Sequence, residues 1–197
     1  SHQINGEQPA MPDAAAKQAL ATLGARYKNK SNVMYALQVE PHDVSWSQLR
    51  PVYEDMVDAI RSAAAPSSPI VMVSGTSWGR NISGAIADPV RRPNIVYKSH
   101  QYNSRAEFQR YFLDAHDAGL PVFIGEFGEA YGSSITMTMD DVNELLRVAR
   151  ERNIGWAAWI FDYKGPPVLL SDRNFTPTQP YGETIRQEMS TTPALPR

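Results

Sequence analysis

Apolar residues recur along the chain in two patterns that take turns, one with helical spacing and one in short continuous runs. The helical spacing predicts helices over residues 12–29, 45–65, 104–119, 139–153 and 181–189. The short runs predict strands over residues 32–39, 70–75, 94–100, 121–126 and 155–161. Because strands and helices alternate, we expect a mostly parallel sheet that is covered by helices.

Boundary signals support several of the predicted helices. Asp13 is a suitable N-cap for the first helix. Ser104 with Glu107, and Thr138 with Asp141, have the spacing of capping boxes, in which side chain and backbone cap each other. These signals predict that helices begin close to residues 13, 104 and 138.

The apolar spacing within two helices predicts which side chains face the core. In the first helix, the apolar positions at helical spacing are Ala16, Leu20, Leu23 and Tyr27. In the second, one face is formed by Leu49, Val52, Met56, Ile60 and Ala63. Both rows are expected to pack inward.

Two architectures fit five apolar strands separated by helices. An open, doubly wound sheet of five strands suits a chain of 197 residues. A (β/α)8 barrel typically needs about 250 residues and eight strands. Counting strands alone therefore favours the open sheet.

The composition is that of an ordinary soluble globular chain, with 42% hydrophobic and 20% charged residues. A formal net charge of −2 offers no electrostatic attraction for nucleic acid or an anionic membrane, so neither is expected as a partner. The chain has no Cys, and His2, His42 and His116 lack the spacing of metal ligands. No metal or cofactor is therefore expected. We expect residues 1–11 to be a tail that includes a tag remnant and lacks a signal peptide, and residues 12–197 to form one domain.

Polar and aromatic residues gather where the predicted strands end. In chain order they are Glu40, Trp78, His100, Tyr102, Glu126, Trp159 and Lys164. The carboxyl ends of parallel strands lie at one edge of the sheet, where α/β proteins build their sites. The agreement of all five strands predicts a site at that edge.

Two carboxylates among aromatic residues are typical of glycoside hydrolysis, in which one protonates the leaving oxygen and the other attacks or activates water. Each residue also has an ordinary explanation. Glu40 and Glu126 could be loop charges, Trp78 and Trp159 core residues, and His100 a hydrogen-bonded histidine. An unrelated open α/β binding domain is therefore an alternative interpretation.

The strand motifs resemble glycoside hydrolase family 5, the cellulase-type enzymes of the retaining barrel clan. The resemblance covers residues 13–189 and follows the family's order. Its motifs are NVMYALQVEPHD, WSQLRPVYEDMVDAIRSAAAPSSPIVMVSGTSW, NIVYKSHQY, PVFIGEFG and GWAAWIFDYKG. They match the fourth to eighth barrel strands. The resemblance thus implies a truncated (β/α)8 barrel, the C-terminal five-eighths.

The resemblance also implies roles for the strand-end residues. Glu126 would be the nucleophile that forms a glycosyl-enzyme, and Glu40 the general acid and then the base. The supporting residues would be Tyr102 beside the nucleophile, His100 and Trp159 around the sugar, and Trp78 and Lys164 as further sugar contacts. The implied reaction is retaining cleavage of β-1,4-linked glucan, with β-mannan as an alternative substrate.

Two departures from the family pattern bear on activity. Val39 stands where the family has the Asn that bonds the sugar 2-hydroxyl. Loss of such a bond costs on the order of 10²- to 10³-fold in rate, by analogy with an oxyanion-hole donor. The first three barrel strands are also absent, with an Arg and a His that support the carboxylates. A catalytically impaired fragment that binds polysaccharide or self-assembles is therefore the alternative function.

The two end strands of such a sheet would be open. Unpaired apolar strands over residues 32–39 and 155–161 are association sites, and they predict a homo-oligomer, most simply a two-fold dimer. By the family resemblance, the protein is expected to be secreted or periplasmic.

Overall fold

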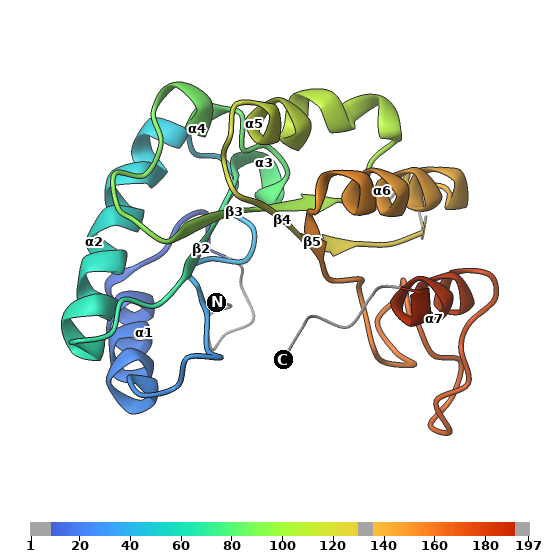
Figure 1. The fold of residues 1–197 in the computed structure, drawn as a ribbon, viewed down its shortest axis with the longest axis horizontal. Coiled ribbons are helices and arrows are strands. Elements are labelled where there is room, and N and C mark those ends of the chain that lie inside the picture. Colours follow the sequence, from blue (N-terminus) through green and yellow to red (C-terminus); the bar gives the residue numbers. More distant parts are fainter. Residues whose placement is uncertain (1–8, 130–135, 192–197) are drawn as a thin grey trace. The chain divides into compact units, whose positions relative to one another are not determined.

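The computed structural model describes residues 9–129 and 136–191 (Figure 1). Its strands are β1 (Tyr35–Ala36), β2 (Val71–Ser74), β3 (Ile95–Gln101), β4 (Val122–Phe127) and β5 (Gly155–Trp156). Its longer helices are α1 (Ala14–Tyr27), α2 (Trp46–Ala64), α6 (Met139–Arg152) and α7 (Tyr181–Thr191). The short helices α3 (Thr76–Gly79), α4 (Gly84–Ala87) and α5 (Asp114–Asp117) lie between β2 and β4 in the sequence.

The five strands form one sheet in the order β1-β2-β3-β4-β5. β1 and β2 are parallel, with Tyr35 opposite Val71, and β2 and β3 are parallel, with Val71 opposite Ile95. Each strand therefore lies beside its neighbours in the sequence. A doubly wound sheet reverses its strand order at a switch point, and this sheet has none. The order is that of five consecutive barrel strands, so the expectation from strand counting was wrong.

β1 and β5 are shorter than the predicted runs because each is an outer strand of the sheet and has a neighbour on one side only. Beyond the regular strands, single hydrogen bonds continue the pairing. Leu37 N donates to Met72 O at 3.1 Å. Trp159 N donates to Phe127 O at 2.9 Å. The extended backbone thus reaches farther along both outer strands than the regular pairing does.

The described residues divide into two compact units. The first holds the residues up to His100 together with Gln109–Phe123, and the second holds Gln101–Phe108 and the residues from Ile124 onward. β3 and β4 each contribute residues to both units. None of the helices in the described residues is long and apolar enough to cross a membrane.

In the first unit, α2 buries Leu49, Met56 and Ile60 of the predicted face, whereas Val52 and Ala63 are half-buried. α1 packs on α2 differently from the prediction, because Leu23 and Tyr27 remain 41% and 38% exposed. The buried residue of α1 is Gly24, where an added Cβ would lie 2.9 Å from Ile60 O. Close approach through the glycine turns the neighbouring apolar side chains outward.

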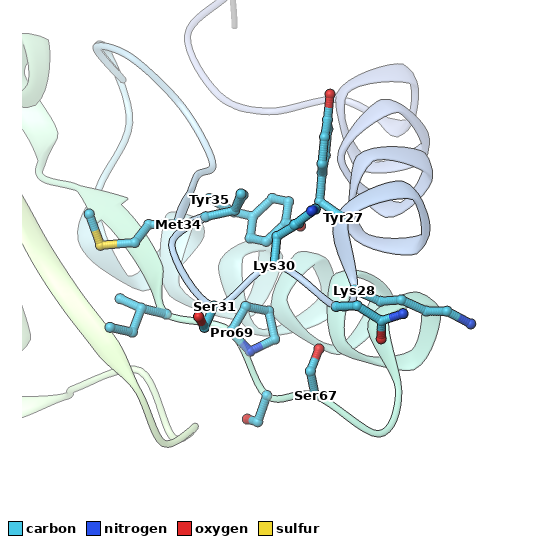
Figure 2. A pocket seen from close by; sticks show the side chains of 12 residues that line it. Tyr27, Lys28, Lys30, Ser31, Met34, Tyr35, Ser67 and Pro69 are labelled. Carbon is cyan, nitrogen blue, oxygen red and sulfur yellow. The ribbon is translucent and has the colours of Figure 1, made fainter.

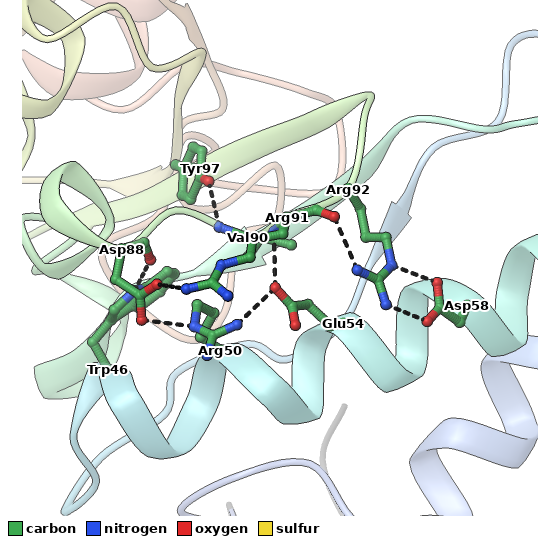
Figure 3. A network of polar contacts seen from close by, with 9 residues as sticks. All are labelled: Trp46, Arg50, Glu54, Asp58, Asp88, Val90, Arg91, Arg92 and Tyr97. Atoms are coloured by element: carbon green, nitrogen blue, oxygen red, sulfur yellow. Dashed lines mark hydrogen bonds and ion pairs between the residues drawn. The ribbon is translucent and has the colours of Figure 1, made fainter.

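A polar network ties α2 to the segment before β3 (Figure 3). Arg50 donates to Asp88 Oδ2 at 2.7 Å and to Glu54 Oε1 at 2.8 Å, and the Arg91 amide also donates to Glu54. Arg92 holds Asp58 through both carboxylate oxygens. Burial acts to raise the pKa of Glu54, but the hydrogen bonds from Arg91 and Arg50 outweigh it and hold the pKa below its ordinary value. The network anchors the segment from which β3 enters the sheet.

In the second unit, Thr138 and Asp141 form the predicted capping box at the start of α6. The Asp141 carboxylate also accepts from the Arg105 amide at 2.9 Å. Ser104 differs from the prediction, since its hydroxyl accepts from the Ala106 amide and caps a 3-10 turn over Arg105–Glu107. The chain then passes through a π-helical segment before α5, so the predicted single helix over residues 104–119 is three short pieces.

Candidate active site

The Glu40 carboxylate follows β1 and is paired with a buried histidine of the same unit. Its Oε1 lies 3.0 Å from Nδ1 of His100, and the two side chains are 21% and 1% exposed. His100 lies near the end of β3, which pairs with β2, and is sixty residues from Glu40 in the sequence. A distant segment of the chain therefore orients the Glu40 carboxylate. The structure brings these two predicted residues together.

The loop after β2 approaches this pair very closely at Gly79. A Cβ added there would lie 3.2 Å from Val39 O and 3.3 Å from His100 Cγ. Gly79 also has a φ of +74°, a backbone conformation that side chains other than glycine rarely adopt. Space and backbone conformation together require glycine at this position.

Trp78 lies on that loop, in a turn whose backbone is strained. Ser77 and Trp78 both have left-handed backbone angles, with φ of +56° and +63°. Such residues persist only where the surroundings hold them, and here the Trp78 amide donates to Pro41 O at 2.8 Å. The Trp78 side chain is 44% exposed, so it is not the core residue of the ordinary explanation.

His42 supports Trp78 from one side, a role that the sequence reasoning missed. The imidazole and indole rings stack with centroids 4.0 Å apart and an interplanar angle of 3°. Nδ1 of His42 lies 3.2 Å from Glu40 O. In the sequence, His42 showed only that it lacks the spacing of a metal ligand. Its position two residues after Glu40 was the available signal.

Residues assigned to the tail lie against the segment that carries Glu40. Nε2 of the buried Gln38 donates to Pro9 O at 2.8 Å, and the His42 amide donates to Ala10 O at 3.1 Å. On the other side, the Ser74 hydroxyl donates to Gln38 O. These bonds hold the backbone on both sides of Val39 and Glu40.

In the second unit, Tyr102 and Glu126 form a pair. The Tyr102 hydroxyl donates to Glu126 Oε2 at 3.1 Å, and both side chains are half-buried. Glu126 lies in β4, and Tyr102 directly follows β3. The backbone oxygen of Tyr102 accepts from the Thr136 amide at 3.2 Å. A phenol hydroxyl in this position stabilises an ionised carboxylate.

Trp159 lies in the same unit, beyond β5. Its indole Nε1 donates to Gly165 O at 3.3 Å, and its backbone oxygen accepts from the Tyr181 hydroxyl at 2.8 Å. That hydroxyl also bonds Phe127 O, and burial raises the pKa of Tyr181. Tyr181 thus joins the ends of two neighbouring strand segments.

Lys164 lies in the loop after Trp159 and is exposed. Its Nζ is 5.3 Å from the centroid of the Tyr163 ring, within cation–π distance. The structure therefore brings Lys164 to an aromatic side chain of its own loop. Of the predicted residues, Glu40, Trp78 and His100 belong to the first unit, and Tyr102, Glu126, Trp159 and Lys164 belong to the second.

Comparison with known proteins places these groups in context. The family model of cellulases, glycosyl hydrolase family 5, matches residues 1–165. Endoglucanase E-5 of Thermobifida fusca is 30% identical over 153 residues, which cover 73% of this chain and 32% of that protein. Endoglucanase A of Butyrivibrio fibrisolvens is 31% identical over 131 residues, covering 64% of this chain and 29% of that protein. The chain spans about a third of the length of these curated relatives.

Solved structures show the same fold. The β-glucanase SdGluc5_26A from Saccharophagus degradans, in complex with cellotetraose, superposes with a TM-score of 0.78 at 20% identity. That match covers 89% of this chain and 59% of the other. The catalytic domain of Thermobifida fusca endoglucanase Cel5A gives a TM-score of 0.77 at 21% identity, covering 90% and 63%. These barrels extend beyond the matched part, which confirms the truncated barrel as the fold class.

Proposed function

The chain belongs to glycosyl hydrolase family 5, and from that premise we propose that it is a retaining glycoside hydrolase that cleaves β-1,4-linked glucan. One observation carries the proposal. Both predicted carboxylates have a dedicated partner of the kind their role needs, Tyr102 on Glu126 and His100 on Glu40. The ordinary explanation of two loop charges does not account for these pairs.

In the first step, the ionised Glu126 attacks the anomeric carbon, and the glycosidic bond to the leaving oxygen breaks. Glu40 gives its proton to that oxygen, so the leaving sugar departs as a neutral alcohol. The Tyr102 hydroxyl bonds Oε2 of Glu126, which leaves the other oxygen to form the glycosyl ester. The product is a covalent glycosyl-enzyme.

In the second step, Glu40 acts as base. It takes a proton from water as the water oxygen attacks the anomeric carbon, and Glu126 is released as a carboxylate. His100 is suited to both states of Glu40, because an imidazole nitrogen can donate or accept a hydrogen bond. Retention requires the two carboxyl groups to lie about 5–5.5 Å apart.

We assign the substrate from the aromatic side chains and the relatives. Trp78, backed by His42, and Trp159 offer indole faces of the kind that stack on pyranose rings. The relatives are named endoglucanases, which supports a β-glucan as substrate, with β-mannan as the alternative. Because a polymeric glucan does not enter cells intact, we further propose that the protein acts outside the cytoplasm.

A second candidate function is a weakened fragment that assembles with a second copy. Val39 cannot make the hydrogen bond of the family's Asn, and the residues that the structure describes form five barrel strands. A surface hollow of about 410 Å³ lies at the start of β1 and β2, lined among others by Tyr27, Met34 and Ile70 (Figure 2). Met34 and Ile70 are 51% and 41% exposed beside the outer strand β1, and such a surface favours a dimer contact.

The test is turnover of a soluble β-glucan together with trapping of the intermediate. Wild-type protein should release reducing sugar, and a 2-fluoro-β-cellobioside with an activated leaving group should add one fluorocellobiosyl mass to the peptide that contains Glu126. Glu126→Gln should abolish both results while circular dichroism stays unchanged. Turnover by Glu126→Gln at the wild-type level would refute the assignment. A wild-type protein that is inert but dimeric by light scattering would favour the second candidate.

A further inference from the structure

The loop after β5 exposes two aromatic side chains that the proposed reaction does not use. Phe161 and Phe175 are 69% and 65% exposed, and their rings lie nearly parallel, with centroids 5.9 Å apart and an interplanar angle of 14°. Exposing two large apolar rings side by side is unfavourable in water. We call residues 161–176 the aromatic loop.

The turn that carries Phe175 is rigid and strained. Phe175 has a φ of +62°, which is rare for a bulky residue and persists only where neighbours impose it. Asp172 imposes it by accepting hydrogen bonds from the Asn174 amide at 2.8 Å and from the Thr176 hydroxyl at 2.9 Å. The Ser171 amide closes the turn on Thr176 O at 2.8 Å. These bonds therefore hold the backbone on which the ring stands.

The backbone that carries the other ring is held by hydrogen bonds on both sides of Phe161. The Ile160 amide donates to Pro167 O at 2.9 Å, and the Leu170 amide donates to Asp162 O at 3.1 Å. These bonds set the backbone on which Phe161 stands. The two rings thus form a pre-organised pair, which lowers the entropic cost of binding a ligand.

The aromatic loop is continuous with a proposed sugar contact. Phe161 lies two residues after Trp159, whose indole donates to Gly165 O within the loop. The same loop also carries hydrogen-bonding side chains, since Arg173 Nε donates to the Tyr163 hydroxyl at 2.9 Å and Lys164 Nζ lies 5.3 Å from the centroid of the Tyr163 ring. A loop that combines flat apolar faces with hydrogen-bonding groups suits the CH faces and the hydroxyl edges of a sugar chain.

We infer that Phe161 and Phe175 form an additional binding surface for a β-linked glucan chain that extends from Trp159. The inference rests on the proposed function for its ligand class. The distance of 5.9 Å between the ring centroids is comparable to the length of one pyranose unit in an extended chain. The surface therefore holds sugar units away from the bond that is cut, and it favours polymers over short substrates.

The test is affinity electrophoresis of the full chain in gels with and without soluble β-glucan, in the Glu126→Gln background so that the polymer stays intact. Phe161→Ala and Phe175→Ala should each weaken the apparent affinity about two- to tenfold, as expected for loss of one aromatic contact. Phe175→Gly removes the ring while suiting the left-handed turn, and should weaken binding equally. Phe161→Tyr should retain the wild-type affinity.

Met189→Ala is the matched control, because Met189 is 65% exposed on α7 and lies outside the loop. It should leave retardation unchanged. Ring-removing variants that bind β-glucan as tightly as the parent protein would overturn the inference. The inference would also be overturned if light scattering showed a changed oligomeric state in those variants while their affinity for glucan stayed unaltered. A second copy of the chain would then be the occupant of the surface. If hydrolysis depends on Glu126 but the ring-removing variants bind β-glucan like the parent protein, this surface fails and the proposed reaction stands.

Discussion

The two proposed catalytic carboxylates have different environments, and the difference fits different roles. Glu40 is paired with the imidazole of His100, a buried group that can donate or accept a hydrogen bond. Glu126 accepts from the Tyr102 hydroxyl, which acts as a donor at neutral pH. The first pairing suits a carboxyl group that gains and loses a proton, and the second suits one that stays ionised. Which partner a carboxylate has is therefore informative about its role.

Loss of either proposed catalytic carboxylate should have the largest effects, and the leaving group of the substrate separates the two roles. Glu40→Gln should lower kcat/KM on β-glucan roughly 10²- to 10⁴-fold, the usual contribution of general acid–base catalysis. A dinitrophenyl β-cellobioside needs no proton on its leaving group, so the rate of its glycosylation step should fall much less. Burst kinetics with both substrates measure this. Exogenous azide should restore turnover of the aryl substrate.

Equal losses on the two substrates would contradict the acid role of Glu40. Glu126→Gln provides the contrast, because removal of a nucleophile should abolish turnover of both substrates, whatever their leaving groups.

A smaller effect is expected from the partner of the nucleophile. Tyr102→Phe removes a hydrogen bond to a charged group, worth about 1.5–3 kcal/mol, so kcat/KM should fall roughly 10- to 150-fold. Tyr27→Phe is the matched control, because Tyr27 lies exposed on α1, and it should leave kcat/KM unchanged. Wild-type kinetics in Tyr102→Phe would show that the bond to Glu126 does not contribute to the reaction.

The smallest effects concern the scaffolds of the two units. Burial acts to raise the pKa of Asp141, but hydrogen bonds from Arg105 and Thr138 hold it below the ordinary 3.8, and Glu54 is held below 4.5 in the same way. A lowered folded-state pKa stabilises the protein above the unfolded value and loses that effect as the pH falls through the folded value.

Asp141→Asn, at a side chain that is 4% exposed, should destabilise by about 1–3 kcal/mol, and Glu54→Gln by about 1 kcal/mol. Each kcal/mol corresponds to roughly 2–4 °C in Tm for a chain of this size. Calorimetry at pH 7 and at pH 3 should show the differences from wild type shrinking in acid. Differences that grow in acid would contradict the sign.

Local signals in the sequence predicted most of the elements. The Thr138–Asp141 capping box and most of the buried face of α2 are where the sequence signals place them. The family motifs also predicted the sequential strand order, which counting alone did not. Such signals succeed because capping and amphipathic spacing depend on residues a few positions apart.

Features that depend on distant partners were missed. Leu23 and Tyr27 have the spacing of a buried face, yet Gly24 lets α1 approach α2 so closely that both turn outward. The stack of His42 on Trp78 depends on a left-handed turn that Pro41 O helps to hold. Nothing in the residues around Trp78 indicated that conformation.

The sequence by itself determined the alternation of strands and helices, the family, and which residues stand at the strand ends. Those properties follow from local spacing and from motifs that remain contiguous along the chain. Only the tertiary structure decided that Tyr102 bonds Glu126, that His100 bonds Glu40, and that Phe161 lies beside Phe175. Each of these pairs joins residues 14 to 60 positions apart, and long-range packing, which one-dimensional spacing does not specify, brings them together.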